Sequence, residues 1–345
     1  PVVFAANIAE DKIGAPDSYD FAFAWYSDTQ YYSEEYQNHY ANIVNWIVEN
    51  KDELDIQYVL HTGDIVDEPD EEYEWAYASE QQQVLDDAGV PYGILGGNHD
   101  TAFGNMDYDM FWKYFGADRY EDNTWYGGSY KNNLGHYDII EKDGVEILML
   151  YISWDVYEEE AEWLNSVLAK YPDTPAIIAT HCGINADGEQ SYTSQYLHDN
   201  VCAENENVIA VFGGHFHGSS INKATYENAD GTTRTVYEIC TVYQSGSEGG
   251  SGYIKMLYFD LANGKIYINT YSPSKDDVNY YDGNFYDDPA DSVPMSSVDR
   301  VILPLDIERS TGKSLTVSDL SVSSIGSELL GSEAAADGST SVKLT

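Results

Sequence analysis

Gly96-Gly97-Asn98-His99-Asp100 is the stretch that decides the interpretation of this chain. It follows Pro91–Leu95, a short apolar run with the length of a buried strand. The two glycines allow a sharp turn and leave room beside the backbone. An amide, an imidazole and a carboxylate then come in succession, at a place where an α/β sheet usually presents its chemistry. Taken alone the pattern is weak, because Asn and Asp are also common turn residues.

Four further turns repeat this arrangement, in which an apolar strand leads into side chains that can bind a metal. They are Ser27-Asp28-Thr29-Gln30, Gly63-Asp64-Ile65-Val66-Asp67, Thr180-His181 and Gly213-Gly214-His215-Phe216-His217. Carboxylate, amide and imidazole groups suit hard and borderline divalent cations. Asp28 and Gln30 lie two residues apart, as do His215 and His217, so in extended backbone each pair faces one side. The repetition therefore predicts a metal centre at the ends of five strands.

Strands and helices alternate over the first two thirds of the chain, and strands dominate the rest. Apolar runs predict strands at 21–26, 56–60, 91–95, 136–141, 145–152, 176–179, 208–212, 234–241, 253–259, 265–271 and 301–305. Helical spacing predicts helices at 71–88, 108–115, 158–170 and 194–203, and a first helix with Ser33 as its N-cap. This order is typical of an α/β fold in which two mixed sheets pack face to face with flanking helices outside, a four-layer α-β-β-α sandwich.

The charge of the chain restricts its partners. It has 60 acidic and 16 basic residues and a formal net charge of -44. Such a charge opposes binding to nucleic acid or to an anionic bilayer, and the longest apolar runs are too short to span a membrane. We expect a secreted or cell-surface protein, with the cytoplasm of a halophile as the alternative. Three cysteines do not indicate a disulfide framework, and we expect Cys182 to be a packing residue.

The five motifs, in this order, resemble those of the calcineurin-like metallophosphoesterase superfamily over residues 21–305. The resemblance implies a bacterial, dinuclear-metal-dependent phosphoesterase, in which a metal-bound hydroxide attacks a phosphodiester or phosphomonoester and His99 assists the leaving group. The diester is slightly favoured, by similarity to extracellular members. The resemblance assigns one metal to Asp28, Gln30, Asp64 and His217, and the other to Asp64, Asn98, His181 and His215.

Two further carboxylates and one departure follow from the same resemblance. Asp100 would orient His99, and Asp67 would support the ligands from behind. Gln30 stands where the family more often has His. An amide oxygen is a neutral and weaker ligand, so the metals stay open among manganese, iron, zinc, magnesium and calcium, with zinc less favoured.

The stretch that includes Tyr243 and Gln244 is similar to a subset of secreted bacterial members. These two residues are therefore candidates for substrate contact, with packing at a sheet edge as an equal alternative. Four histidines belong to no motif, and we expect them to be structural or on the surface: His39, His61, His136 and His198.

The resemblance also suggests how the chain is divided. Residues 1–20 form a leading segment with an edge strand at 2–5, residues 21–305 form the catalytic domain, and 306–345 form a linker or the start of a further β module of a larger surface protein. The alternative to an enzyme is a catalytically retired scaffold that serves as a surface binding module. The presence of every expected ligand, with Gln30 as a plausible replacement, argues against it.

Overall fold

The computed structural model describes residues 15–281 and 299–305 and two short paired strands, β15 (Glu333–Ala334) and β16 (Thr340–Ser341). The expected edge strand at 2–5 and most of the tail at 306–345 lie outside the described residues. The division of the chain at residues 20 and 305 stays a prediction.

One sheet holds the first three strands of the chain, in the order β13-β12-β11-β1-β2-β3, with β14 also paired to β12. Its parallel strands are β1 (Phe21–Tyr26), β2 (Ile56–His61) and β3 (Tyr92–Ile94). Its antiparallel strands are β11 (Ile254–Asp260), β12 (Lys265–Ser272), β13 (Asp277–Val278) and β14 (Arg300–Pro304). The sheet therefore joins the start of the chain to its last third.

The second sheet has the order β4-β5-β6-β7-β8-β10-β9. Its strands are β4 (Tyr126–Tyr130), β5 (Gly135–Lys142), β6 (Val145–Ile152), β7 (Ala176–Cys182), β8 (Val208–Gly214), β9 (Gly218–Glu227) and β10 (Thr233–Val242). Strands β6, β7, β8 and β10 run parallel, β5 and β9 are antiparallel to them, and β4 pairs antiparallel with β5. Both sheets thus bring the carboxyl ends of parallel strands to one edge, where the predicted site lies.

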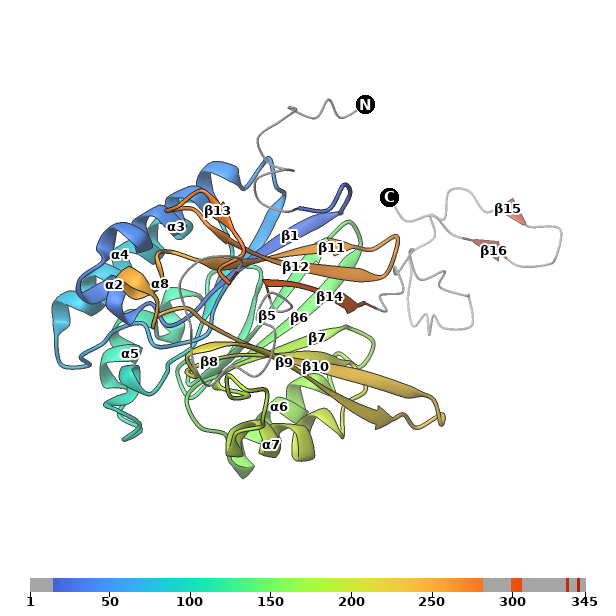
Figure 1. Ribbon diagram of the computed structural model, residues 1–345. Helices are drawn as coiled ribbons and strands as arrows, with labels where there is room; N and C mark the ends of the chain where they lie inside the picture. Colours follow the sequence, from blue (N-terminus) through green and yellow to red (C-terminus); the bar gives the residue numbers. More distant parts are fainter. Residues whose placement is uncertain (1–14, 282–298, 306–332, 335–339, 342–345) are drawn as a thin grey trace, which may run out of the picture.

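Helices cover the outer faces of the two sheets (Figure 1). They are α2 (Gln30–Glu34), α3 (Gln37–Asn50), α4 (Glu72–Ala88), α5 (Asp109–Phe115), α6 (Glu158–Leu168), α7 (Tyr192–Leu197) and α8 (Ser247–Gly250), with the short turns η1 (His99–Thr101), η2 (Ala117–Arg119) and η3 (His198–Cys202). Helices α3 and α4 lie beside β1 and β2, whereas α6 and α7 lie beyond β7 and β8 (Figure 1). The predicted α/β four-layer sandwich is confirmed.

Strand β1 shows how the layers form. Its alternate residues Phe21, Phe23 and Trp25 face the second sheet, and the Trp25 ring stacks on Phe212 of β8 at 4.6 Å between ring centroids. Tyr26, on the other face, packs against Tyr40 of α3. Because side chains alternate along a strand, a strand that is apolar at every position is buried on both faces.

Two expectations about secondary structure were wrong. Ser33 is not an N-cap: it lies buried inside α2, and its hydroxyl donates to the Ile65 carbonyl oxygen at 2.6 Å. A tertiary contact with the loop after β2 therefore replaces the capping role. Strand β9 was not expected, because alternate side chains in its second half are exposed and polar, which removes the apolar signal. It pairs with β10 over ten residues.

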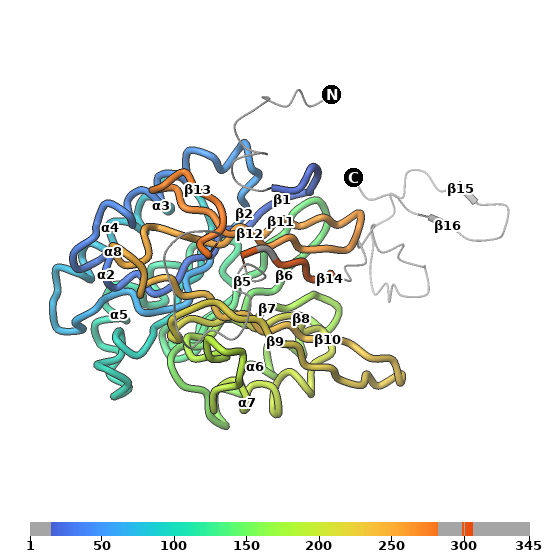
Figure 2. The backbone as a smooth tube through the Cα atoms, viewed as in Figure 1, coloured from blue at the N-terminus to red at the C-terminus, as the bar shows by residue number. Residues whose placement is uncertain are grey.

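The last third of the chain reaches back to the first helix. Figure 2 shows α8 beside α2, although more than 200 residues separate them in sequence. The Gly252 amide donates to the Tyr32 hydroxyl oxygen at 2.9 Å and fixes this contact. Among the residues that the structure describes, no helix is both long enough and apolar enough to cross a membrane.

Candidate active site

Three candidate ligands have an unusual backbone conformation. Asp28, Asp64 and His215 have φ angles of 53°, 53° and 68°, in the left-handed region. Such a conformation costs free energy for a residue other than glycine, and it persists where the surrounding structure demands it. Each residue ends a strand with a sharp turn, so this backbone places the three side chains at the shared edge of the two sheets.

Asp64, His181 and His215 form the core of the site. Their ligand atoms all lie within 4.8 Å of one another, and Asp64 and His181 are buried. The Nδ1–H of His181 donates to the Thr62 carbonyl oxygen at 2.8 Å, which leaves Nε2 toward Asp64 and Asn98. Nε2 lies 3.2 Å from an oxygen of each. A proton at Nε2 satisfies both acceptors, and a divalent cation can take its place.

Asp28 and Gln30 lie beside this core. The Asp28 carboxylate accepts the backbone N–H of His215 at 3.1 Å and the hydroxyl of Ser27 at 2.5 Å. Gln30 donates its amide Nε2–H to Asp64 Oδ2 at 3.3 Å. The other amide atom, Oε1, is buried and has no hydrogen-bond partner among the described residues. A buried carbonyl oxygen without a donor, next to a carboxylate, is the environment that a cation satisfies.

The pKa values at the site respond to burial and to neighbouring charges. Burial raises the pKa of Asp28 to about 7, although His181 acts in the opposite direction. Burial also acts to raise the pKa of Asp64, but His181 holds it below its ordinary value. Burial acts to lower the pKa of His181, and Asp64 outweighs this and raises it to about 9. Two buried carboxylates that depend on one imidazole for positive charge fit a site built for cations.

Glycines allow the loops to approach this closely. A Cβ atom on Gly97 would lie 2.2 Å from Asp64 Oδ1 and 2.8 Å from His181 Cε1. A Cβ atom on Gly214 would lie 2.6 Å from Asp28 Oδ2. The glycines at these turns are therefore required by space, and this requirement accounts for their place in the motifs.

The structure gives His99 a different partner from the one expected. The Nδ1–H of His99 donates to the Asp67 carbonyl oxygen at 2.7 Å, and the Asp67 carboxylate lies 3.5 Å from the same nitrogen. The Asp100 carboxylate instead accepts backbone N–H groups of Ile65, Val66 and Gly97, at 2.7 to 3.1 Å. Asp67 thus makes the direct contact with the ring, and Asp100 joins the loops after β2 and β3.

His217 lies at the exposed edge of the site. Its Nε2 is 2.5 Å from Gln244 Nε2, and its Nδ1 contacts the Ser245 hydroxyl. Gln244 therefore lies next to a candidate ligand. Tyr243 points elsewhere: it is buried, packs on Tyr280 and Tyr253, and its hydroxyl bonds Thr270. The position of Tyr243 therefore corresponds to packing, the alternative to substrate contact.

Trp154 is a site residue that sequence reasoning missed. Its ring lies 4.8 Å from that of His215 and 5.7 Å from that of His181. The available signal was its place just after the strand ending at Ile152, a sixth strand end at the same edge. Ser27, which bonds Asp28, was part of the first motif but was given no role, and Ser245, next to Gln244, was not named.

The four histidines outside the motifs have protein partners. Their contacts are His39 with Ser274 and Glu248, His61 with Thr29, His136 with Asp138, and His198 with Glu238. Burial lowers the pKa of His61 to about 3. Cys182 is half-buried, and burial raises its pKa, so neither feature indicates a nucleophile.

Comparison with known proteins decides the family. The family model of the calcineurin-like phosphoesterases matches residues 21–219, more than half of the chain. The chain belongs to the calcineurin-like phosphoesterase family. The resemblance inferred from the five motifs is thereby confirmed, and the family supports a metal-dependent phosphoesterase.

Individual proteins that are similar to this chain add detail. The uncharacterized protein YvnB of Bacillus subtilis (strain 168) is 42% identical over 283 residues, which are 81% of this chain and 22% of that protein. The chain thus spans about a fifth of the length of the curated relative it matches. The purple acid phosphatase PPD1 from yellow lupin (Lupinus luteus) seeds is 14% identical with a TM-score of 0.51, over 85% of this chain and 55% of that one. At this identity the likeness shows a shared fold.

Proposed function

We propose that this chain hydrolyses a phosphate ester at a centre of two divalent cations. The observation that carries the proposal is the convergence of Asp64, His181 and His215 from three different strand ends within 4.8 Å. Asn98, Asp28 and Gln30 supply further oxygen atoms around this core. His217, at the exposed edge, would complete the set.

Bound divalent cations would neutralise the charge of the phosphate oxygens and lower the pKa of a water molecule. Asp28, Gln30, Asp64 and His217 would hold one cation, and Asp64, Asn98, His181 and His215 the other. The orphaned Oε1 of Gln30 supports this division, because a neutral amide oxygen needs a cation or a donor when buried. Its weak ligation favours manganese, iron, magnesium or calcium over zinc at that position.

His99 would protonate the leaving oxygen. A carbonyl oxygen can only accept, so the contact with Asp67 fixes the proton on Nδ1 and leaves Nε2 as the nitrogen that can face a substrate. Burial acts to lower the pKa of His99, but Asp64 and Asp67 outweigh it and raise the pKa above its ordinary value. A raised pKa favours the protonated imidazole, which is the form that a general acid requires. Asp67 and Asp100 would act as positioning residues.

The bond type and the location belong to the proposal as well. We favour a phosphodiester slightly over a phosphomonoester, by similarity to extracellular members of the family. The net charge of -44 supports a place outside the cell or on its surface. The chain covers 22% of the length of the Bacillus subtilis protein, so the proposal concerns the activity of this chain alone.

The test combines metal content with turnover. We would measure metals in the purified protein by elemental analysis, then the hydrolysis of bis-p-nitrophenyl phosphate and p-nitrophenyl phosphate with added manganese. About two metals per chain and clear hydrolysis of one ester are expected. Metal-free protein that hydrolyses neither ester with manganese, magnesium, iron, zinc or calcium would favour the retired scaffold.

A further inference from the structure

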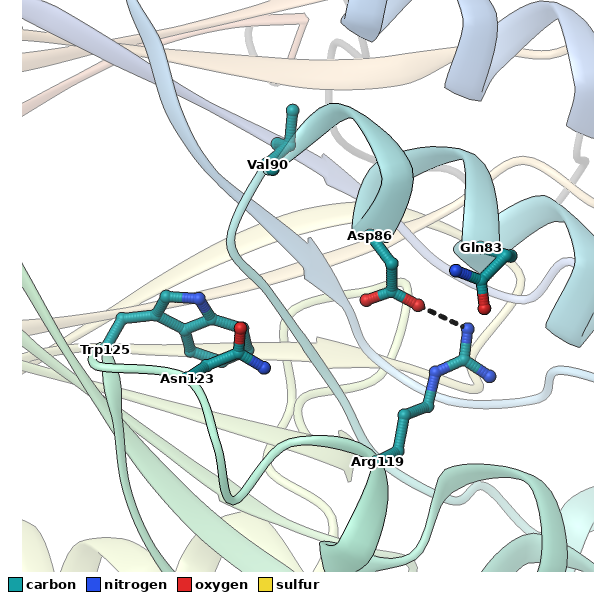
Figure 3. A pocket seen from close by; sticks show the side chains of 7 residues that line it. Gln83, Asp86, Val90, Arg119, Asn123 and Trp125 are labelled. Atoms are coloured by element: carbon teal, nitrogen blue, oxygen red, sulfur yellow. Dashed lines mark hydrogen bonds and ion pairs between the residues drawn. The ribbon is translucent and has the colours of Figure 1, made fainter.

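Two cavities lined by residues that the structure describes lie outside the candidate metal centre, and the second lies beside a segment that contacts His217. The first, of about 340 Å³, is lined by Asp86, Val90, Arg119 and Trp125 among others (Figure 3). The Arg119 guanidinium is already bonded by Asp86, Tyr92 and Ser79. Val90 lies at the amino end of β3, opposite to the site loops. This cavity offers no free charge and no route to the metals.

The second cavity, which we call the tyrosine cavity, has a volume of about 460 Å³. It is lined by Ser247, Ser251, Tyr253, Lys275, Asp276, Asp277 and Tyr280. Its size lies within the range of small-molecule sites. The rings of Tyr253 and Tyr280 are nearly perpendicular, at 86°, with centroids 5.0 Å apart. The lining therefore combines aromatic rings with hydroxyl and carboxylate groups.

Residues 244–247 lead along the chain from the candidate metal centre to this cavity. Gln244 and Ser245 contact both ring nitrogens of His217, and Ser247, two residues further, lines the cavity. A Cβ atom on Gly246 would lie 2.2 Å from the Tyr280 hydroxyl oxygen, so this tyrosine packs directly on the connecting segment. A substrate whose phosphate lies at the metals could thus extend into the tyrosine cavity.

The segment that follows Ser247 beside the cavity is an unusual backbone turn. Five successive residues, 248–252, all have positive φ angles, from 52° to 97°. Two of them, Glu248 and Ser251, are not glycine, so the turn is strained. Glu248 bonds His39 and Lys275, and the Ser251 hydroxyl donates to the Ser247 carbonyl oxygen. Strain maintained by several contacts is typical of functional sites rather than of simple connections.

Buried hydrogen bonds of Asp299 and Lys255 support the tyrosine side of the cavity. The Asp299 carboxylate accepts the backbone N–H groups of Tyr280 and Tyr281, each at 3.0 Å. Lys255 is fully buried and donates to the Thr270 hydroxyl oxygen at 2.7 Å, and this hydroxyl donates to the Asp299 carbonyl oxygen. The position of Tyr280 is therefore fixed from the core.

The charges and hydroxyl groups that line the tyrosine cavity favour some classes of ligand over others. Asp276 and Asp277 outnumber Lys275, which is already paired with Glu248, so a second anionic group on the ligand is disfavoured. An alkyl chain would offer the lining carboxylates no hydrogen-bond donor. A polyhydroxy compound donates hydroxyl protons to carboxylates and packs its C–H face on aromatic rings. Asp277 already accepts the Tyr253 hydroxyl at 2.6 Å, and a carboxylate can accept further bonds.

We propose, building on the proposed function, that the tyrosine cavity binds the alcohol part of the substrate, and that this part is a sugar or another polyol. Asp277 accepts hydroxyl protons of the ligand, and Tyr280 supplies the aromatic surface. The phosphate lies at the metal centre, with the ester bond between the two sites. The domain is thus a hydrolase of sugar or polyol phosphates.

Ligand-observed saturation-transfer NMR tests this without requiring turnover. The full chain, loaded with magnesium because it is diamagnetic, is mixed in turn with glucose, myo-inositol and choline. Transfer to the ring protons of glucose or myo-inositol is expected. Transfer to choline alone, or to none of the probes, would overturn the proposal. Hydrolysis of the nitrophenyl esters is measured on the same sample, so a failed sugar site and a failed phosphoesterase give different results.

Two variants locate the binding. Asp277→Asn keeps the shape and the acceptor for Tyr253, and it should weaken polyol binding about 10-fold or more, because a hydrogen bond to a charged group is lost. Asp173→Asn, on an exposed loop after α6, makes the same chemical change elsewhere and should leave binding unchanged. Equal binding by both variants, with unchanged melting temperatures, would show that the ligand occupies another place.

Discussion

Replacing Gly97 with alanine tests the claim that the site loops are packed to their limit. The new Cβ atom would lie 2.2 Å from Asp64 Oδ1, 2.5 Å from the Asp64 backbone nitrogen and 2.8 Å from His181 Cε1. All three distances are below 3.0 Å, which real Cβ contacts essentially never reach. Asp64 and His181 are both buried, so neither can swing into solvent. The loops must separate, and the ligand atoms must separate with them.

The expected loss of stability follows from the clash of the new Cβ atom. Overpacking a dense site costs about 1–3 kcal/mol, and a clash with backbone belongs at the upper end. A loss of about 3 kcal/mol should lower the melting temperature by roughly 5 °C in a domain of this size. Scanning calorimetry measures this change, and elemental analysis should show a loss of metal from the variant.

Gly96→Ala is the matched control in the same loop. The nearest atoms to a Cβ atom on Gly96 are 3.6 Å away, an ordinary contact, and its backbone is not left-handed. Its stability should stay within about 0.5 kcal/mol of the parent protein. If Gly97→Ala retained the metal content and melting temperature of Gly96→Ala, the close approach of the loops would be refuted.

Three further predictions concern the acid, the core and the metals. His99→Gln should keep the metals but lower turnover about 10²–10⁴-fold, and unchanged turnover in an assay of either nitrophenyl ester would contradict the acid role. Burial lowers the pKa of Lys255 from 10.5 to about 8, although Asp299 acts in the opposite direction. Between pH 8 and 10.5 the folded protein therefore binds fewer protons than the unfolded one, and its stability rises with pH. In urea unfolding, the free energy of unfolding of the parent protein should rise by up to about 3 kcal/mol from pH 8 to 10.5, relative to that of Lys255→Met. If the two proteins gave parallel curves of unfolding free energy against pH, the effect would be excluded. Removal of metals with EDTA should lower the melting temperature, because Asp28 and Asp64 lose their cations, and calorimetry that shows no change would count against bound metals.

The sequence allowed prediction of the sandwich because β1 and its neighbours are apolar at nearly every position. Burial on both faces leaves a continuous hydrophobic run, and the helices between the strands have an apolar stripe. The same reasoning failed at β9, where alternate side chains in the second half of the strand face solvent. It also failed at Ser33, because a hydroxyl that can cap a helix can equally bond the Ile65 carbonyl oxygen from a distant loop.

At the site, residue type was predictable but contact was not. Asp67 and Asp100 are both carboxylates after a strand, and only the folded loops show that Asp67 contacts His99 while Asp100 accepts three backbone amides. Trp154 carries no ligand group, so no chemical motif could indicate it. The tyrosine cavity depends on Tyr253 and Tyr280, which meet through strands and a turn distant in sequence.

The division of the site between the two sheets has a consequence for folding. Asp28 follows the first strand of one sheet and His215 follows β8 of the other, 187 residues later, and the two are directly bonded. Contacts of such sequence separation form late, because the intervening chain must first be ordered. A chain emerging from the ribosome would hold half of the ligands long before the rest exist. Capture of the cations would therefore mark the completion of folding, and it would keep the two sheets from separating afterwards.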